Sequence, residues 1–243
     1  MAGTARRSET PVRPGPGSAV PGGQRSPEGT RMPLEEAMRT QRSIRRLLPD
    51  PVDDEILLRC IDLALKAPTG SNAQNWEWLV VRDPVIQARL ARLNRASWAL
   101  YGRLGRLVQR NQPKGLRNID AVQWQADHFA EAPVIVVPCM RTWVPKVLPI
   151  LATSHYGSIY PAIQNFLLAC RSEGLGAGLT TLPLWSKTLA QLALGLPPNV
   201  QPCAVIPVGW PRGHYGPNTR KSVEKVTHID RWGNRPEAVS GTG

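Results

Sequence analysis

The 243-residue sequence predicts one domain of the mixed α/β or α+β class, flanked by two tails. Segments with a helical period alternate with short apolar runs typical of strands along the middle of the chain. Hydrophobic residues make up 42% of the sequence, which suits one well-buried domain of this length. The two ends contain few residues that could be buried. Together these observations favour a single packed unit over residues 31–232.

The N-terminal residues 1–30 consist mostly of Pro, Gly, Ser and Arg, a composition that cannot bury enough apolar surface to fold. We therefore expect a disordered tail there, and a shorter polar tail over residues 233–243. The formal charge is +12, and most of it belongs to the part between the tails. Such a charge is compatible with nucleic acid, a membrane surface or anionic small molecules as partners.

Two helices are predicted before the first strand. The apolar residues of segment 33–41 would share one helix face: Leu34, Ala37 and Met38. The second helix begins after Asp53, a suitable N-cap residue, and ends before Pro68, which lacks the amide proton that a helix needs. Five residues at helical spacing would form its buried face: Ile56, Leu57, Cys60, Ile61 and Ala64.

A strand over residues 77–83 and a helix over residues 83–94 follow. From Arg92 to Ile119 the chain carries seven Lys or Arg residues and no acid. We interpret residues 92–131 as a variable, basic segment that could act as a lid. Four of its residues form a short apolar stripe: Leu100, Leu104, Leu107 and Val108. Three tryptophans in or near this region could line a ligand site: Trp98, Trp124 and Trp143.

The second half of the domain begins with a buried strand over residues 132–140. A long helix over residues 158–174 follows, with Ser158 as a candidate cap, Pro161 in its first turn and Gly174 at its C-terminal end. Beyond it we expect three more elements: a short strand or extended turn over 176–182, a helix over 185–195 and one strand over 201–210. A polar, basic extension ends the domain.

All four cysteines lie in apolar runs without a CxxC motif: Cys60, Cys139, Cys170 and Cys203. They predict buried free thiols in a reducing compartment, and no metal site. No apolar run is long enough to cross a membrane, and the N-terminus lacks the apolar core of a signal peptide. We therefore expect a cytoplasmic protein that uses neither a metal nor a membrane.

Several polar segments have both a functional and an ordinary structural interpretation. In "QRSIRR", residues 41–46, guanidinium groups and a hydroxyl suit a phosphate, although the pattern alone is more typical of a solvated turn. Segment 68–75, "PTGSNAQN", has more amides and hydroxyls than a turn needs, but it could satisfy its own backbone. Gly176 and Gly178 either admit a close neighbour or form a tight turn; their spacing does not match a dinucleotide fingerprint.

The order of these segments along residues 32–230 resembles the FMN-dependent nitroreductase family. The segments that carry the resemblance are "RSIRR", "DPVDDEIL", "APTGSNAQNWEWLVV", "AIQNFLLACRSEGLG", "VIPVGWP" and "RKSVEKV". The resemblance implies an α+β three-layer sandwich, in which helices surround a mostly antiparallel central sheet. It also implies an obligate homodimer with an FMN at each of two shared sites, electrons from NADPH or NADH, and no metal.

The resemblance also assigns roles to individual positions. Arg42 and Ser43 correspond to the phosphate-side turn, together with the C-terminal cations Arg220 and Lys221. Arg45 corresponds to the cation beside the pyrimidine edge of the flavin. The remaining positions would contact the flavin ring: Asn72 and Gln74 from the polar turn, and the backbone around Thr180 and Thr181 at the nitrogen that accepts the hydride.

Two positions depart from the family pattern. Gln41 stands where many members have an Arg, so one phosphate contact could be lost or could move to Arg42. The usual Gln-Pro-Trp is Gln74-Asn75-Trp76 here, which changes the rigidity of the turn.

The resemblance implies an oxidoreductase that passes a hydride from NAD(P)H to a small electron-poor molecule, such as a nitroaromatic or a quinone, by a ping-pong mechanism. Because the flavin would carry the chemistry, no protein acid or base is assigned. Two related alternatives keep FMN: reductive dehalogenation, although the acidic lid motif of dehalogenases is not evident, and flavin breakdown. A basic nucleic-acid-binding protein is the alternative from another class, but no groove-reading motif supports it.

Overall fold

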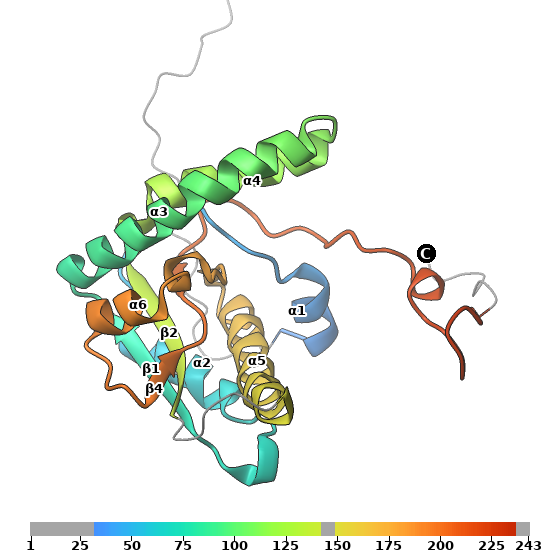
Figure 1. The fold of residues 1–243 in the computed structure, drawn as a ribbon, viewed down its shortest axis with the longest axis horizontal. Coiled ribbons are helices and arrows are strands. Elements are labelled where there is room, and N and C mark those ends of the chain that lie inside the picture. Colours follow the sequence, from blue (N-terminus) through green and yellow to red (C-terminus); the bar gives the residue numbers. More distant parts are fainter. Residues whose placement is uncertain (1–31, 142–148, 237–243) are drawn as a thin grey trace, which may run out of the picture. The chain divides into compact units, whose positions relative to one another are not determined.

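The fold centres on β2, Val134–Arg141, in a five-stranded antiparallel sheet (Figure 1). The computed structural model describes residues 32–141 and 149–236, so the predicted tail over 1–30 and most of that over 233–243 lie outside it. The strand order is β1-β2-β5-β3, and β4 also pairs with β2. The other strands are short: β1 Trp76–Val81, β3 Gly176–Ala177, β4 Val200–Pro202 and β5 Ile206–Gly209. The predicted α+β fold with an antiparallel sheet is therefore confirmed.

Both faces of β2 are buried because its residues are apolar without interruption from Val134 to Val137. Val134 and Val136 pack into one core with helices α2, Asp54–Ala64, and α5, Pro149–Ser172. Ile135 and Val137 pack into a second core on the other face, with α3, Pro84–Gln109, and α6, Lys187–Leu194. Helices therefore cover both faces of the sheet, in three layers.

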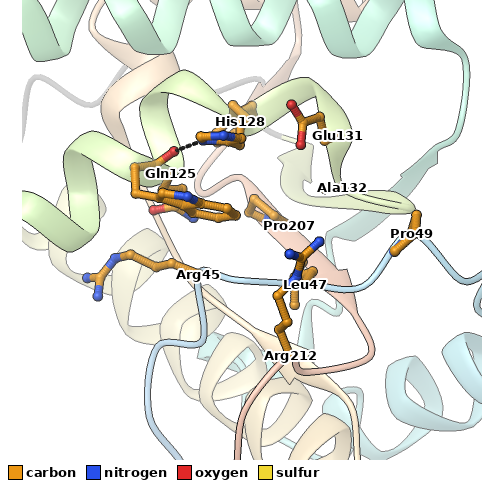
Figure 2. A pocket seen from close by; sticks show the side chains of 11 residues that line it. Arg45, Leu47, Pro49, Gln125, His128, Glu131, Ala132, Pro207 and Arg212 are labelled. Atoms are coloured by element: carbon orange, nitrogen blue, oxygen red, sulfur yellow. Dashed lines mark hydrogen bonds between the residues drawn. The ribbon is translucent and has the colours of Figure 1, made fainter. Parts of the chain in front are cut away.

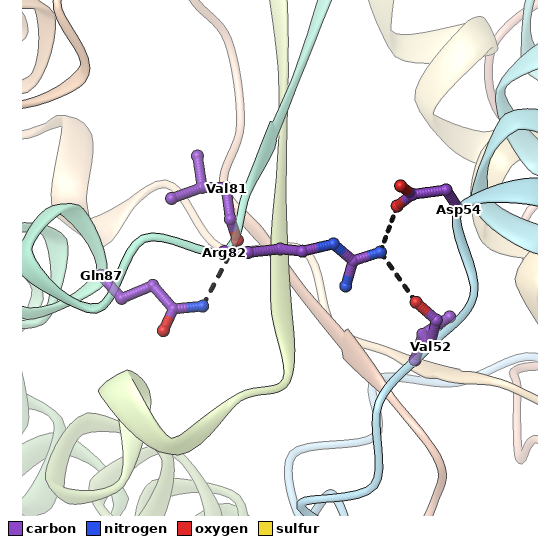
Figure 3. A network of polar contacts seen from close by, with 5 residues as sticks. All are labelled: Val52, Asp54, Val81, Arg82 and Gln87. Carbon is purple, nitrogen blue, oxygen red and sulfur yellow. Dashed lines mark hydrogen bonds and ion pairs between the residues drawn. The ribbon is translucent and has the colours of Figure 1, made fainter.

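Two long side chains tie β1 to the helices at its end (Figure 3). Arg82 donates a hydrogen bond of 2.7 Å to the carbonyl of Val52 and forms an ion pair with Asp54 at the start of α2. The buried amide of Gln87 donates from α3 to the carbonyls of Val81 and Ala132. These contacts fix α2 and α3 against the sheet.

Several predicted helices are correct with small changes. Helix α1, Leu34–Thr40, buries Ala37 but leaves Leu34 and Met38 more than half exposed. Asp53 is at the N-cap position of α2, yet its side chain makes no capping hydrogen bond. Helix α6 is capped by the Ser186 hydroxyl, which accepts from the Leu189 amide.

The basic segment is helical rather than irregular. Helix α3 runs through Gln109, and α4, Pro113–Asp127, returns beside it as a hairpin (Figure 1). The Trp98 indole donates a 2.8 Å hydrogen bond to Gln123 between the two helices. The predicted apolar stripe does not pack, because four residues on the outer side of α3 are exposed: Leu100, Leu104, Leu107 and Val108.

The prediction for the long core helix was wrong at its start. Helix α5 begins at Pro149, so Pro161 lies inside it rather than in its first turn. The hydroxyl of Ser158 does not cap the helix; it donates to the carbonyl of Ser154 and accepts from the Gly70 amide. A Pro in the helix interior is disfavoured because it lacks an amide proton, and that rule misplaced the boundary.

The C-terminal end of α5 was predicted correctly. Gly174 has a φ of +79°, and its amide donates to the carbonyl of Arg171. The next amide, that of Leu175, donates to Cys170 over 2.8 Å. This pair of bonds is the Schellman motif, which a glycine favours because a left-handed residue must follow the helix.

The single strand predicted over residues 201–210 is two strands. β4 pairs with Cys139–Arg141 of β2, whereas β5 pairs with Val134–Val136. Pro138 lies between these two ranges and has no amide proton to donate to the ladder. Between β4 and β5, the Cys203 amide donates to the carbonyl of Pro138 over 2.9 Å, and Val205 forms an isolated antiparallel bridge with Thr180.

Candidate functional site

The "QRSIRR" segment lies in an extended conformation against β3. The Ile44 amide donates a 3.0 Å hydrogen bond to the carbonyl of Ala177. A Cβ at Gly176 would come within 2.8 Å of the Ile44 side chain, and one at Gly178 within 3.1 Å of the Ile44 carbonyl oxygen. The two glycines therefore admit this segment of the chain itself, which places Arg42, Ser43 and Arg45 beside the strand.

The C-terminal extension runs antiparallel along the other side of this segment, passing α1 (Figure 1). The Arg212 amide donates to the carbonyl of Arg46, and the Asn218 amide donates to that of Arg39. The Asn218 side chain also donates to the carbonyl of Gln41. The two cations predicted at the phosphate, Arg220 and Lys221, lie two and three residues after Asn218 and are exposed.

A tyrosine that the sequence did not single out anchors this extension. The Tyr215 hydroxyl donates to the carbonyl of Leu175, and its ring lies 4.1 Å from the guanidinium carbon of Arg171. Burial raises the pKa of Tyr215 to about 12. The hydroxyl therefore stays protonated and keeps its role as a donor throughout the physiological range.

Arg45 is half-buried at the edge of a cavity of about 410 Å³, which we call the Arg45 cavity (Figure 2). The lining comes from three segments far apart in sequence, residues 45–49, 124–132 and 207–212, and includes Arg45, Trp124, Gln125, His128, Glu131 and Arg212. Burial lowers the pKa of the Arg45 guanidinium, and the nearby charge of Arg42 lowers it further. A cation that has lost part of its hydration gains more from an anionic ligand than a fully solvated one does.

Helix α4 supplies the wall of the cavity opposite Arg45. The rings of Trp124 and His128 stack with centroids 4.1 Å apart, and the Arg46 guanidinium carbon lies 5.3 Å from the centroid of the Trp124 ring. Buried Gln125 comes close to Gly178, where its amide nitrogen would be 3.6 Å from an added Cβ. Of the three tryptophans expected near a ligand, Trp124 alone lines this cavity, and Trp143 lies outside the described residues.

Nothing in the sequence pattern singled out Gln125 or His128 as site residues. Both lie in a segment interpreted as a variable lid, and neither belongs to a motif. Their position just before the buried strand β2 was the one usable signal, because that strand fixes where the end of α4 must be.

The backbone of Thr180 is already paired. Its amide donates to Val205 over 2.9 Å, its carbonyl accepts from the same residue, and its hydroxyl accepts from the Leu182 amide. Thr181 is exposed, and within the described residues its amide has no hydrogen-bond partner. Of the two predicted donors, Thr181 is therefore the one with a free backbone amide.

The polar turn that contains Asn72 and Gln74 is held in an unusual conformation. Ser71, Asn72 and Gln74 have φ values of 53°, 51° and 47°, in the left-handed region that favours glycine. The Gln74 amide group donates to Asn72 Oδ1 over 2.9 Å, and the Gln74 backbone donates to the Thr69 hydroxyl. The turn thus partly satisfies its own polar groups, and strain of this kind is often found at functional sites.

Within one chain, the polar turn lies beside the middle of α5, and the "QRSIRR" segment lies near its C-terminal end. The turn is anchored at Ser158, whereas Arg171 donates to the Thr40 hydroxyl just before the segment. Because an α-helix rises about 1.5 Å per residue, these anchors are about 20 Å apart. Within one chain the structure therefore places Arg42, Ser43 and Arg45 beside β3, but it does not bring Asn72 and Gln74 beside them.

The four cysteines are buried free thiols, as predicted. Burial raises the pKa of Cys139 to about 12, and it also raises that of Cys170. Within residues 32–141 and 149–236, no group of three or more potential ligands could hold a metal ion. None of the described helices combines the length and the apolar character required to cross a membrane.

Comparisons with known proteins show which family the chain is similar to. The model of the nitroreductase family matches residues 38–210. An iodotyrosine deiodinase of Drosophila melanogaster is 27% identical over 198 residues, covering 79% of this chain and 67% of that protein. A putative NADH dehydrogenase/NAD(P)H nitroreductase of Methanothermobacter thermautotrophicus is 25% identical and covers 84% and 90%.

Solved structures share the fold. Oxidised iodotyrosine deiodinase, solved with FMN and 3-iodo-L-tyrosine, superposes with a TM-score of 0.61 at 22% identity. The superposition covers 82% of this chain and 98% of that one.

Proposed function

Since the chain belongs to the nitroreductase family of NAD(P)H-dependent flavin oxidoreductases, we propose that it binds FMN and reduces a small electron-poor molecule, such as a nitroaromatic or a quinone, with NADPH or NADH. The observation that carries the proposal is the half-buried Arg45, which lines a cavity together with Trp124 and Gln125.

The residues present fit FMN by their chemistry. Arg42, Ser43, Arg220 and Lys221 offer cationic and hydroxyl donors for a phosphate. Arg45 and Gln125 offer a charge and an amide for the polar edge of a flat heteroaromatic ring, and Thr181 offers a backbone amide.

When bound, FMN supplies the two-electron hydride chemistry of the reaction. Arg45 contributes a positive charge where negative charge develops on reduction, and its partial burial strengthens that interaction. The Thr181 amide can hold a hydrogen bond at a ring nitrogen. Walls from α4 restrict water on the side of Trp124.

We also propose that the site is shared by two chains in a homodimer. The polar turn of Asn72 and Gln74 lies about 20 Å along α5 from the "QRSIRR" segment, which favours a turn supplied by the partner. Several apolar residues on α1 and the C-terminal extension are exposed in the single chain, and a partner chain would cover them: Leu34, Met38 and Trp232.

Reductive dehalogenation is the second candidate, and the similarity to iodotyrosine deiodinases favours it. Against it, the α3–α4 hairpin has no acid from Arg92 to Ile119. A zwitterionic amino acid would find no carboxylate for its ammonium group in that range, and the next acid, Asp120, pairs with Arg106.

Mass spectrometry of the ligand released by heat tests the cofactor. FMN is the expected result, and FAD, or no flavin after incubation with FMN, would contradict the proposal. A steady-state screen of nitroaromatics, quinones and 3-iodotyrosine, with NADPH and with NADH, then separates the two candidate reactions.

A further inference from the structure

We infer that His128 takes up a proton on two-electron reduction of the cofactor bound beside Arg45, so that two cations then balance the added negative charge. This inference rests on the proposed function. The two electrons come from NAD(P)H as a hydride, and the extra proton comes from solvent to Nε2 of His128. No other reactant is required.

The imidazole and Arg45 line the same cavity (Figure 2). Nδ1 of His128 lies 2.8 Å from the carbonyl oxygen of Trp124. A carbonyl oxygen can only accept, so Nδ1 must carry a proton. Nε2 is then the nitrogen that gains or loses a proton, and it is the one left for a ligand in the cavity.

Two contacts hold the ring in place. Its plane is within 10° of the Trp124 indole, at a centroid distance of 4.1 Å. A protonated imidazole on an indole face gains a favourable cation–π interaction. The stack therefore accepts both protonation states without a change of orientation.

Groups of both signs surround His128, so the charge of the bound ligand can determine the protonation state of the imidazole. Arg45 and Arg46 come from the extended segment, and Arg212 comes from the C-terminal extension. Glu131 lines the cavity after α4, and Asp127 on α4 accepts hydrogen bonds from Gln123 instead. Histidine changes charge between pH 5 and 8, so one added negative charge nearby is enough to shift its protonation.

The midpoint potential of the bound flavin between pH 5 and 9 tests the inference. Uptake of one more proton changes the equilibrium constant tenfold per pH unit, which is about 30 mV for a two-electron couple. The parent should therefore show a pH window with this additional slope. His128→Gln, which keeps a donor but cannot titrate there, should lose it.

His228→Gln is the matched control. His228 also stacks on a tryptophan, Trp232, at 4.2 Å, and its Nδ1 is also engaged, by the Gly233 amide. It lies in the C-terminal extension and does not line the Arg45 cavity. Its replacement should leave the slope unchanged.

A second measurement needs no variant at His128. NMR of the imidazole Cε1 in the oxidised and reduced parent should place the titration of His128 at a higher pH after reduction. Equal slopes in parent and His128→Gln, or equal titrations in the two redox states, would overturn the inference while a flavin-loaded protein upholds the proposed function. Absence of flavin from the parent and both variants would overturn both.

Discussion

The positive φ angles of Ser71, Asn72 and Gln74 in the polar turn lead to a prediction about stability. A non-glycine residue in this region costs about 1–2 kcal/mol, and glycine costs about 0.5–1 kcal/mol through its greater freedom in the unfolded chain. Ser71→Gly should therefore raise the free energy of unfolding by up to about 1 kcal/mol. For a chain of this size the melting temperature should rise by about 2–4 °C.

Gly70→Ala is the opposing control in the same turn. A Cβ there would come within 2.5 Å of the Ser154 hydroxyl oxygen, so this change should lower the melting temperature. A lower melting temperature for Ser71→Gly would mean that the turn gains more from the serine than it loses in strain.

Arg45 makes a prediction about cofactor binding. A hydrogen bond to a charged group is worth about 1.5–3 kcal/mol, so Arg45→Gln should weaken FMN binding about ten- to a hundredfold. Flavin fluorescence during titration of the apoprotein measures the dissociation constant. Arg39→Gln, at an exposed arginine paired with Glu35, should change it little; equal losses in both variants would point to general charge rather than to the Arg45 cavity.

At the scale of elements, the sequence predicted those helices and strands whose position depends on their own residues and not on contacts with distant parts of the chain. Helix α2, strands β1 and β2, and the end of α5 at Gly174 follow from period and capping. The start of α5 and the division of β4 from β5 do not, because both depend on partners elsewhere. The Ser158 hydroxyl accepts a hydrogen bond from the polar turn, and the strand paired with β2 changes from β5 to β4 around Pro138.

The α3–α4 hairpin carries a prediction of its own. Arg103 and Arg110 are exposed on α3, while Arg106 pairs with Asp120 at 3.0 Å. If the hairpin steers an anionic nucleotide, replacing all three by Gln should slow flavin reduction by NADPH about tenfold or more at low salt. NADH, which has one phosphate fewer, should be affected less.

The dependence of the rate on salt concentration distinguishes electrostatic steering of NADPH from a role of these arginines in solubility alone. Exposed charges are screened over about 8 Å at physiological ionic strength, so the loss with NADPH should shrink as salt rises. A matched triple change outside the hairpin, at Arg39, Arg59 and Lys66, removes the same charge. Equal rates with both nucleotides in the hairpin variant would leave the cations a role in solubility alone.

At the scale of the whole molecule, part of the candidate site was predictable and part was not. Arg42, Ser43 and Arg45 sit in one short motif, so their proximity follows from the sequence. Gln125 and His128 reach the Arg45 cavity only because the hairpin returns to the sheet. Asn218 reaches the carbonyl of Gln41 only because the extension runs along the segment. Such positions depend on tertiary packing, which no local pattern reports.

The oligomeric state is the prediction that belongs to the whole molecule. Trp232 is 89% exposed, and Leu34 on α1 is 64% exposed, so both apolar side chains are available for contact with a partner chain. Light scattering at low micromolar concentration should give twice the mass of the chain. A stable monomer that retains flavin would contradict a site completed by the partner's polar turn.

The extended segment around Arg45 is held by the chain that follows it much later, at Ala177, Arg212 and Asn218. Ribosomes add about 5–20 residues per second, so the roughly 170 residues between Arg45 and Asn218 take about 10–35 s to make. During that time the nascent chain has the early arginines but not the strand neighbours that position them. Cofactor loading should therefore follow release from the ribosome, and a message truncated before the codon for Asn218 should yield a protein that cannot hold the phosphate end of its ligand.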